Sequence, residues 1–252
     1  MAGCGIVLGA GASRRLGRPK QSLPFGDTTV LGWVVRDLEA SVLDRVVVVV
    51  GGGAEEARAG LTVSRAEVVS NDAYASGCSS SLQAGLDAAG DCEAVVLVLG
   101  DMPGVDAGVV DAVWHGWARE RPWATVTSYR GEPGHPFVFS AAAFPTLRGL
   151  HGDKAVWRIL DTEGHRVARV AIDRPLPLDV DTWDDYQEVC RQFGFAPDPG
   201  ERASPARRVE GPPQVDEQSR ASGRREPELD RGGRSAAGGV GEDSARLRHA
   251  RR

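Results

Sequence analysis

Strongly apolar runs alternate with amphipathic segments over the first 196 residues of the chain. The runs RVVVVV at 45–50 and AVVLVL at 94–99 are apolar at nearly every position, which is typical of parallel strands buried on both faces. Apolar residues recur at helical spacing in 30–38, and Leu82 and Leu86 stand four residues apart. The pattern predicts strands at 5–8, 45–50, 67–69, 94–99, 124–128, 136–139 and 167–172. It predicts helices at 30–38, 79–89, 109–117, 154–160 and 183–193.

The order of these elements favours one fold class. Strands that alternate with helices, two of the strands being apolar throughout, indicate a mostly parallel sheet covered by helices on both faces. The expected fold is therefore α/β, a three-layer sandwich. Ligands in such folds bind beyond the carboxyl ends of the strands, so the segments that follow strands are where functional residues are expected.

The composition of the chain changes near residue 197. Beyond Phe195 the sequence is rich in Pro, Gly, Ser, Arg and Glu and has almost no large apolar residues. Such a segment buries too little apolar surface to offset the entropy of ordering. We predict a globular domain at 1–196 and a disordered polar tail at 197–252. The alternative is an arm for nucleic acid or a partner, which the acidic residues between the arginines disfavour.

Charge and cysteine content exclude several classes of protein. The 252 residues include 30 Lys and Arg against 35 Asp and Glu, a net charge of -5, which argues against a protein that coats nucleic acid or anionic lipid. No apolar run in the sequence approaches the roughly 18 residues that cross a bilayer. The four cysteines are widely scattered without a CxxC pair, which excludes a zinc ribbon and fits a reducing cytoplasm.

The segment after the first predicted strand combines glycine with cations. LGAGASRRLGRPKQSLPFG at 8–26 contains three glycines before Arg18 together with the cations Arg14, Arg15 and Lys20, so backbone N–H groups can approach an anion closely. The GxGxxG dinucleotide pattern fails at Arg14, and the Walker sequence Gly-Lys-Ser/Thr does not occur. We predict a loop that holds a triphosphate without either motif. An ordinary strand-to-helix connection is the alternative.

Acidic residues follow two further predicted segments. Asp101, in Gly-Asp-Met-Pro after the strand at 94–99, is placed to hold Mg²⁺, which proteins bind through one or two carboxylates plus phosphate oxygens. The alternative is that Asp101 caps the next helix. Asp179 and Asp181 fall on one side of an extended segment before the last helix. Asp181 is the preferred second metal ligand, and the other carboxylate is a candidate helix cap.

Three more stretches carry unusual residues. The serines at 79–81 form a hydroxyl cluster at a helix start, where N–H groups and hydroxyls can meet phosphate or ribose, although capping would explain one of them. His135, in Gly-His-Pro at the start of a strand, is either a binding or a structural histidine. Asp153 and Lys154 precede a helix. Lys20 and Lys154 are the two lysines among 30 basic residues, which favours sites that need a compact ammonium over chance.

Six motifs occur in an order that points to a known family. They are LGAGASRRLGRPK, SGCSSSLQAGL, LGDMP, GHPFVF, HGDKAVWRIL and DVDT. This series resembles the molybdenum cofactor cytidylyltransferases, within the MobA-like nucleotidyltransferase superfamily, over residues 4–190. The glycine loop and the Gly-Asp dipeptide mark the superfamily, and the GHP, GDK and SSSL elements mark the cytidylyl branch. Two positions depart from the pattern: Gly9 in a loop that is usually Leu-Ala-Ala-Gly, and Cys78 where Met or Gln is common.

The resemblance implies a Rossmann-like nucleotidyltransferase sheet and a reaction. The reaction is transfer of CMP from CTP to the phosphate of molybdenum-molybdopterin, with release of pyrophosphate and with Mg²⁺ as cofactor. The implied catalytic residues are Arg15, Lys20 and Asp101, and the implied metal ligands are Asp101 and Asp181. The implied acceptor-binding residues are His135, Asp153 and Lys154. The implied nucleotide-binding residues are Leu8, Gly9, Ala10, Gly11, Ser13, Lys20, Asn71, Ser79, Ser80 and Ser81.

Other functions stay open at the level of sequence. A guanylyl or other nucleotidyltransferase shares the glycine loop and the Gly-Asp dipeptide. Some proteins that resemble this family are oxidoreductases acting on a nicotine-derived pigment, although the missing dinucleotide pattern disfavours NAD. A non-enzymatic molybdopterin chaperone is a third class, which the intact Lys20 and Asp101 disfavour. We expect a cytoplasmic enzyme of molybdenum cofactor biosynthesis. Its expected partners are CTP, a molybdopterin-type cofactor and a molybdenum hydroxylase as recipient, without nucleic acid or membrane.

Overall fold

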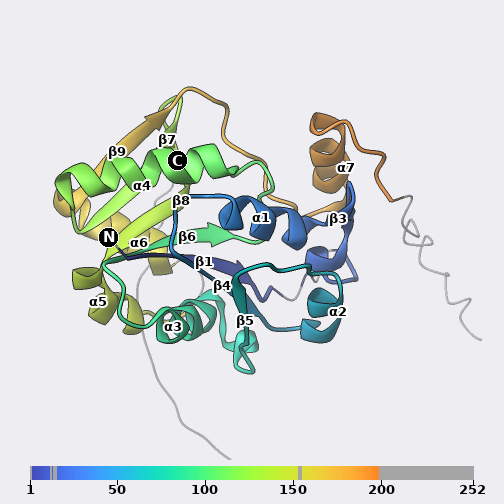
Figure 1. Cartoon of the computed structure of the whole chain (residues 1–252), viewed down its shortest axis with the longest axis horizontal. Helices are drawn as coiled ribbons and strands as arrows, with labels where there is room; N and C mark the ends of the chain where they lie inside the picture. The colour runs from blue at the N-terminus through green and yellow to red at the C-terminus, as the bar shows by residue number, and fades with distance from the viewer. Residues whose placement is uncertain (1, 12, 14–15, 153–154, 199–252) are drawn as a thin grey trace, which may run out of the picture. The chain divides into compact units, whose positions relative to one another are not determined.

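A sheet of seven strands organises the structure, a computed structural model that describes residues 2–11, 13, 16–152 and 155–198. Figure 1 shows the sheet with helices packed on both faces. The strands are β1 (Gly3–Gly9), β4 (Arg45–Val50), β5 (Ala66–Ser70), β6 (Ala94–Leu99), β7 (Ala124–Tyr129), β8 (Glu132–Ser140) and β9 (Val167–Ile172). A separate hairpin pairs β2 (Pro24–Phe25) with β3 (Thr28–Thr29).

The strand order brings the carboxyl ends of the central strands together. The order is β5-β4-β1-β6-β8-β7-β9. β1 pairs in parallel with β4 and β6, β4 with β5, and β7 with β9, whereas β8 runs antiparallel to β6 and β7. Leu8 of β1 stands opposite Leu99 of β6, so the segments that follow these two strands begin next to each other. The predicted mostly parallel α/β sandwich is confirmed.

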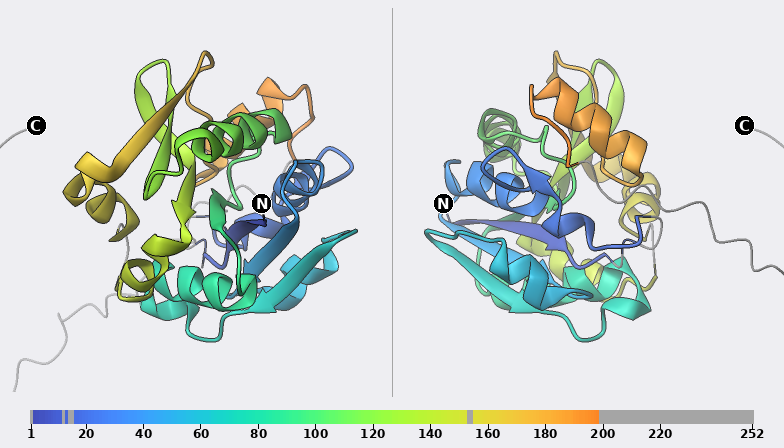
Figure 2. Two further views of the ribbon diagram at one scale, coloured as in Figure 1. Left: turned by 60° about the vertical axis from the view of Figure 1, so that its left-hand side comes forward. Right: turned by 90° about the vertical axis from the view of Figure 1, so that its right-hand side faces the viewer.

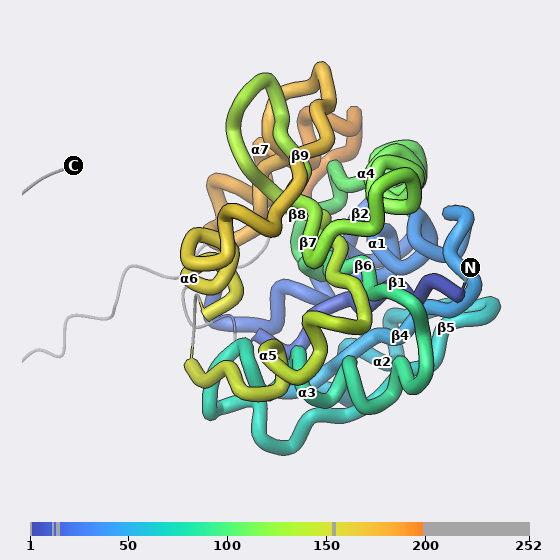
Figure 3. The backbone as a smooth tube through the Cα atoms, turned by 90° about the vertical axis from the view of Figure 1, so that its left-hand side faces the viewer, coloured from blue at the N-terminus to red at the C-terminus, as the bar shows by residue number. Residues whose placement is uncertain are grey.

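Helices cover both faces of the sheet and bury two apolar cores. They are α1 (Val30–Glu39), α2 (Ala54–Ala59), α3 (Cys78–Ala89), α4 (Ala107–Glu120), α5 (Phe144–Arg148), α6 (Ala155–Thr162) and α7 (Trp183–Gln192). α1, α2 and α4 contribute to one core, and α3, α5 and α6 to the other. Figure 3 shows α4 and α3 on opposite sides of the sheet. No helix in the described part of the chain is long and apolar enough to cross a membrane.

The two cores explain why the second predicted strand has no polar alternation. In β4, Val48 packs in the core with α1 and α4, whereas Val47 and Val49 pack in the core with α3. Successive side chains of a strand point to opposite faces, so a strand buried on both faces must be apolar at every position. The same argument applies to β6, which lies in the middle of the sheet.

A third apolar cluster joins the β2–β3 hairpin to α7 and the residues after it. Phe25 is buried and packs edge-on against Phe193 and Phe195, with ring centroids 5.0 Å apart in both pairs. The hydroxyl of Tyr186 in α7 donates to the carbonyl of Pro24 at 2.6 Å. The right-hand view of Figure 2 shows α7 beside this N-terminal segment. The last helix therefore holds the chain that follows the glycine loop.

All of the predicted strands and helices are present, and three short elements were missed. α2 has the sequence AEEARA with Ala57 as its one buried residue, so it shows no apolar periodicity. α5 has five residues, too few to display a helical repeat. The β2–β3 hairpin has two residues in each strand. β8 also begins four residues earlier than predicted, in EPGHP, because glycine and proline disfavour a strand prediction.

Asp198, which we assigned to the polar tail, makes two contacts with the domain. Asp198 accepts a hydrogen bond from Arg18 at 2.5 Å, and its N–H donates to the Tyr186 hydroxyl at 3.1 Å. The side chains of Arg18 and Asp198 are 40% and 27% exposed, so the ion pair contributes at most about 1 kcal/mol. Residues 199–252 lie outside the described part of the chain, and the division at 196/197 stays a prediction.

A pair of truncations tests where the domain ends. Truncation after Asp198 is expected to leave the melting temperature and activity nearly unchanged, since the removed segment lacks apolar anchors. Truncation after Gly194 removes Phe195 from its aromatic cluster and is expected to lower the melting temperature by roughly 5–10 °C. Differential scanning calorimetry measures both. A loss of several degrees in the first truncation would show that the tail packs on the domain.

Candidate active site

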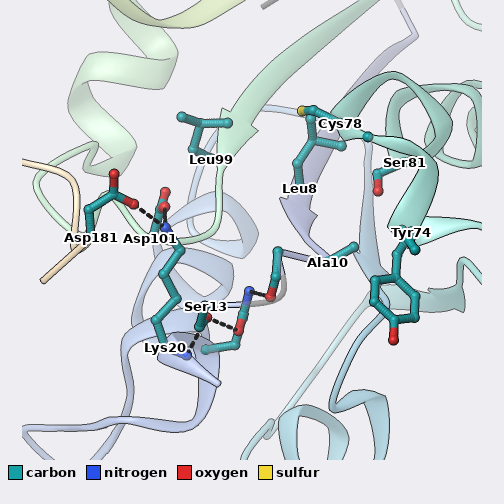
Figure 4. A pocket seen from close by; sticks show the side chains of 14 residues that line it. Leu8, Ala10, Ser13, Lys20, Tyr74, Cys78, Ser81, Leu99, Asp101 and Asp181 are labelled. Carbon is teal, nitrogen blue, oxygen red and sulfur yellow. Dashed lines mark hydrogen bonds and ion pairs between the residues drawn. The ribbon is translucent and has the colours of Figure 1, made fainter. Parts of the chain in front are cut away.

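A cavity of about 720 Å³ lies beyond the carboxyl ends of β1 and β6. Leu8 and Leu99, at the ends of these strands, line it together with the loop after β1 and the start of α3. Figure 4 shows its charged side chains gathered at one end and Ser81 and Tyr74 at the other. This is the edge of the sheet at which parallel α/β folds bind ligands.

Lys20, Asp101 and Asp181 form an ion cluster at one end of the cavity. The Lys20 ammonium contacts Asp101 Oδ2 and lies 2.8 Å from Asp181 Oδ1. The side chains of Lys20 and Asp101 are 13% and 14% exposed, and that of Asp181 is 33% exposed. They come from the turn after the glycine loop, the end of β6 and the segment before α7. The fold thus brings together three of the residues predicted to bind phosphate and metal.

Burial and charge act in opposite directions on this cluster. Burial by itself would lower the pKa of Lys20, but the carboxylates of Asp101 and Asp181 outweigh it, so the pKa of Lys20 is raised. Burial raises the pKa of Asp101, and the Lys20 ammonium opposes that shift. Lys20 is therefore a cation at neutral pH. Within the described residues, Lys20 is the cation that contacts both carboxyl groups.

A buried glutamine is hydrogen-bonded to two residues of the glycine loop. Gln21 donates through Nε2 to the carbonyl of Gly11 at 3.1 Å, and its Oε1 accepts from the Ser13 hydroxyl at 3.4 Å. The Ser13 hydroxyl in turn accepts from the N–H of Lys20 at 2.8 Å. These bonds connect the loop that approaches the ligand with the turn that carries Lys20.

The start of α3 lines the opposite end of the cavity. Gly77 is the N-cap of α3 and provides no side-chain capping bond, and it lines the cavity together with Cys78. The positive end of the dipole of α3 therefore lies at the cavity, where it favours an anionic ligand. Ser81 lies one turn into the helix and lines the cavity. Tyr74, 37% exposed, rests over Gly51 and Gly52, where an added Cβ would come within 2.6 and 2.8 Å of it. This end therefore offers a hydroxyl group and a helix N-terminus beside an aromatic ring.

Asn71 holds the predicted serines in place rather than lining the cavity. Its Nδ2 donates to Ser80 Oγ at 2.9 Å and to Ser81 Oγ at 3.0 Å, and its Oδ1 accepts from the N–H of Ala73 at 3.0 Å. Of the ten residues predicted to bind nucleotide, those that line the cavity are Leu8, Ala10, Gly11, Ser13, Lys20 and Ser81. Those outside its lining are Gly9, Asn71, Ser79 and Ser80.

His135 is buried in β8 and does not line the cavity. Its Nδ1 lies 3.2 Å from the carbonyl of Leu97, and its ring packs on Phe137 with centroids 4.0 Å apart. Burial lowers the pKa of His135 to about 4, so the ring is neutral at physiological pH. Asp153 and Lys154, the other predicted acceptor-binding residues, lie outside the described residues, as does the predicted catalytic Arg15.

The buried histidine gives the domain a pH-dependent stability. Because the pKa of His135 falls from 6.5 to about 4 on folding, the unfolded chain binds more protons between these values. The contribution of the neutral ring to the free energy of unfolding is complete above pH 6.5. It decreases by about 3 kcal/mol as the pH drops from 6.5 to 4. Urea titrations of His135→Gln and the wild-type protein from pH 4 to 7 measure it. Identical slopes in the two proteins would contradict the assignment.

Both helix-cap alternatives for the acidic residues are wrong. Asp106 caps α4 with its own side chain, so Asp101 is not the cap of that helix. Thr182 caps α7 through a capping box, so neither Asp179 nor Asp181 serves there. The carboxyl groups of Asp101 and Asp181 therefore have no role in starting a helix, and both face the cavity instead.

The two carboxyl groups fit a divalent cation that phosphate completes. Asp101 Oδ1 is buried and has no hydrogen-bond partner within the described part of the chain. The described residues contain no group of three or more His, Cys, Asp or Glu able to hold a metal, so the protein supplies at most two carboxylates here. Mg²⁺ is commonly bound by one or two carboxylates plus substrate phosphates.

Six residues that line the cavity were not among the predicted site residues: Gln21, Tyr74, Ala75, Gly77, Cys78 and Leu99. Gln21 and Tyr74 have the largest polar side chains among them. Gln21 directly follows Lys20, and a glutamine inside a cationic loop gave no sign that it would be buried. Tyr74 had a weak signal, because Gly51 and Gly52 follow a buried strand and a glycine pair there permits close approach of a ring. Neither could be assigned to the site before the loops were placed.

Comparison with known proteins identifies the family of this chain. Residues 5–169 match the MobA-like NTP transferase domain. The nicotine blue oxidoreductase of Paenarthrobacter nicotinovorans is 30% identical over 149 residues, 57% of this chain and 73% of that protein. The molybdenum cofactor cytidylyltransferase of Escherichia coli K12 is 28% identical over 182 residues, 72% of this chain and 92% of that protein.

A solved structure adds a metal to the comparison. The crystal structure of Rv0371c from Mycobacterium tuberculosis in complex with manganese is 34% identical, with a TM-score of 0.67, and the match covers 76% of this chain and 99% of that chain. The family match includes the glycine loop, the Gly-Asp dipeptide and the start of α3, which together line the cavity. The chain belongs to the MobA-like NTP transferase domain family and is a nucleotidyltransferase.

Proposed function

We propose that this protein transfers CMP from CTP to the phosphate of molybdenum-molybdopterin and releases pyrophosphate. The observation that carries the reaction type is the cluster of Lys20, Asp101 and Asp181, which faces the start of α3 across one cavity. The choice of CTP and molybdopterin rests on the motif series and on the relative from Escherichia coli, at 28% identity.

The triphosphate is assigned to the charged end of the cavity. A phosphate oxygen of the acceptor attacks the α-phosphorus of CTP, and the bond from that phosphorus to the bridging oxygen breaks as pyrophosphate leaves. This chemistry needs positioning and charge neutralisation more than covalent participation. Backbone N–H groups of the loop at Ala10 and Gly11 orient the phosphates, and Lys20 offsets the charge on the departing pyrophosphate. Arg15 is proposed to assist it.

A divalent metal is assigned to Asp101 and Asp181. Asp101 and Asp181 would hold Mg²⁺, which would supply positive charge that reduces repulsion between the phosphates and the incoming acceptor. The manganese complex of Rv0371c supports use of a divalent ion in related proteins. Mg²⁺ is the ion proposed for this chain.

The nucleoside is assigned to the end of the cavity beside α3. The Ser81 hydroxyl offers a donor and an acceptor there, beside the N-terminus of α3, and Asn71 keeps Ser81 in position. The acceptor is proposed to bind through Asp153 and Lys154, as the resemblance implies; His135, the third residue implied there, is buried in β8 and does not line the cavity. The partners proposed for the enzyme are CTP, a molybdopterin-type cofactor and a recipient molybdenum hydroxylase in the cytoplasm.

A second candidate function is oxidoreduction, which the relative from Paenarthrobacter nicotinovorans favours. The cavity disfavours it, because its loop lacks the dinucleotide pattern and its charged end is built around a lysine between two carboxyl groups. Incubation with NADH and NADPH, followed by absorbance at the reduced-nicotinamide band, tests oxidoreduction. No consumption above the rate without enzyme is expected.

Nucleotide preference tests the cytidylyl assignment. With Mg²⁺ and molybdenum-molybdopterin, pyrophosphate release is expected to be faster with CTP than with GTP by roughly two powers of ten or more. A site that hydrogen-bonds the matched base loses those bonds with the wrong one, and a pocket sized for a pyrimidine excludes a purine. UTP and ATP at equal concentration are the controls. A preference for GTP would place the chain in the guanylyl branch and leave the assignments of Lys20 and Asp101 standing.

A further inference from the structure

The Lys20 ammonium lies between the two carboxyl groups, at the position that a metal joining Asp101 Oδ2 to Asp181 Oδ1 would take. Its Nζ contacts Asp101 Oδ2 and is 2.8 Å from Asp181 Oδ1, so it bridges the two side chains proposed as metal ligands. The side chain extends to this position from the turn after the glycine loop, below the two carboxyl groups in Figure 4, where the N–H of Lys20 donates to Ser13. A cation that binds these same two oxygens has to displace the ammonium, and one that uses the unpartnered Asp101 Oδ1 instead still lies beside it.

A metal ion alone meets two obstacles at this site. The first is competition, because Lys20 already holds one oxygen of each carboxyl group. The second is repulsion, because Lys20 is mostly buried at 13% exposure and a displaced ammonium stays beside the incoming ion. Unit charges within about 4 Å interact strongly at the effective dielectric constant of a partly buried site.

A triphosphate removes both obstacles. It brings several negative charges to the loop from which Lys20 extends, so the ammonium gains a phosphate partner when it leaves the carboxyl groups. It also supplies the oxygens that complete the coordination of Mg²⁺. On the basis of the proposed function, we infer that Lys20 occupies the metal site until a nucleotide arrives, and that metal binding is therefore conditional on nucleotide binding.

The inference predicts that Lys20→Met gains affinity for a metal ion, although the substitution removes an active-site residue. The substitution removes the competing cation and keeps a side chain of similar length. Lys20→Met is therefore expected to bind Mn²⁺ about tenfold more tightly than the wild-type protein when no nucleotide is added, although it has lost a residue of the active site.

Titration of Mn²⁺ followed by electron paramagnetic resonance of the free ion measures this directly. The full chain is used, with unfolding curves to confirm that each variant is folded, and Lys20→Gln replaces Lys20→Met if the latter does not fold. Arg18→Met is the matched control, because it removes a cation from the same segment that pairs with Asp198 and does not line the cavity. The double variant Lys20→Met/Asp101→Asn shows whether the gain in Mn²⁺ affinity depends on the Asp101 carboxylate.

Three results decide the inference. A gain in Lys20→Met that is absent in Arg18→Met and lost in the double variant supports it. Equal Mn²⁺ affinity in folded Lys20→Met and wild-type protein overturns it. The metal role of Asp101 is tested separately: it stands if Mn²⁺ binds the wild-type protein in the presence of CTP and does not bind Asp101→Asn. Equal Mn²⁺ binding by the wild-type protein and Asp101→Asn in the presence of CTP would instead contradict the proposed function.

Discussion

Asp101→Asn is expected to reduce turnover by roughly 10³-fold or more while the protein still folds. The substitution keeps the shape of the side chain but removes the charge that holds the metal and faces Lys20. Positioned electrostatic groups of this kind contribute about two to three powers of ten each, and here the metal is lost as well. Pyrophosphate release at saturating Mg²⁺ and CTP measures it, and EDTA is expected to stop the wild-type enzyme to the same degree.

Asp179→Asn is the matched control for Asp101→Asn. Asp179 stands two residues from Asp181 in the same segment but is exposed and does not line the cavity. Its activity is expected to stay within about twofold of wild type. Wild-type turnover in Asp101→Asn, or turnover that EDTA leaves unchanged, would show that the metal assignment is wrong.

Lys20→Ala is expected to lower turnover by roughly 10²–10³-fold, the usual cost of losing one preorganised donor. The ammonium offsets charge that grows on the pyrophosphate, so the loss should fall mainly on kcat rather than on KM. Arg18→Ala, two residues away and paired with Asp198, is expected to retain most activity. An effect on KM alone would assign Lys20 to ground-state binding, and unchanged turnover in both variants would refute its catalytic role.

The fold could be predicted because its strands are buried on both faces. The apolar run of β4 is explained by two cores that share Val47 and Val48 between them, and no surface strand would have that composition. The reversed direction of β8 could not be read from its residues, because strand polarity depends on the connection through β7 and not on side-chain pattern. The short helix α2 was not predicted, because a single buried alanine gives no helical periodicity of apolar residues.

The candidate site was predictable where a residue follows a central strand, and less so elsewhere. Asp101 could be assigned because carboxyl ends of parallel strands share one edge, and the structure places it against Lys20 and Asp181. Asn71 was expected to face the nucleoside, yet its amide bonds to Ser80 and Ser81. A sequence shows which residues can donate hydrogen bonds, but the choice between a ligand and a neighbouring hydroxyl depends on how the loops pack.

A crystal structure with Mn²⁺ and a non-hydrolysable CTP analogue tests the central claim most directly. Anomalous scattering locates the ion, and the account predicts one Mn²⁺ within about 2.1 Å of an Asp101 carboxylate oxygen, bridged to the triphosphate. It also predicts that Lys20 Nζ has moved from Asp101 to a phosphate oxygen. A nucleotide bound elsewhere, or Mn²⁺ bound away from Asp101 with the contact between Lys20 and Asp101 intact, would contradict it.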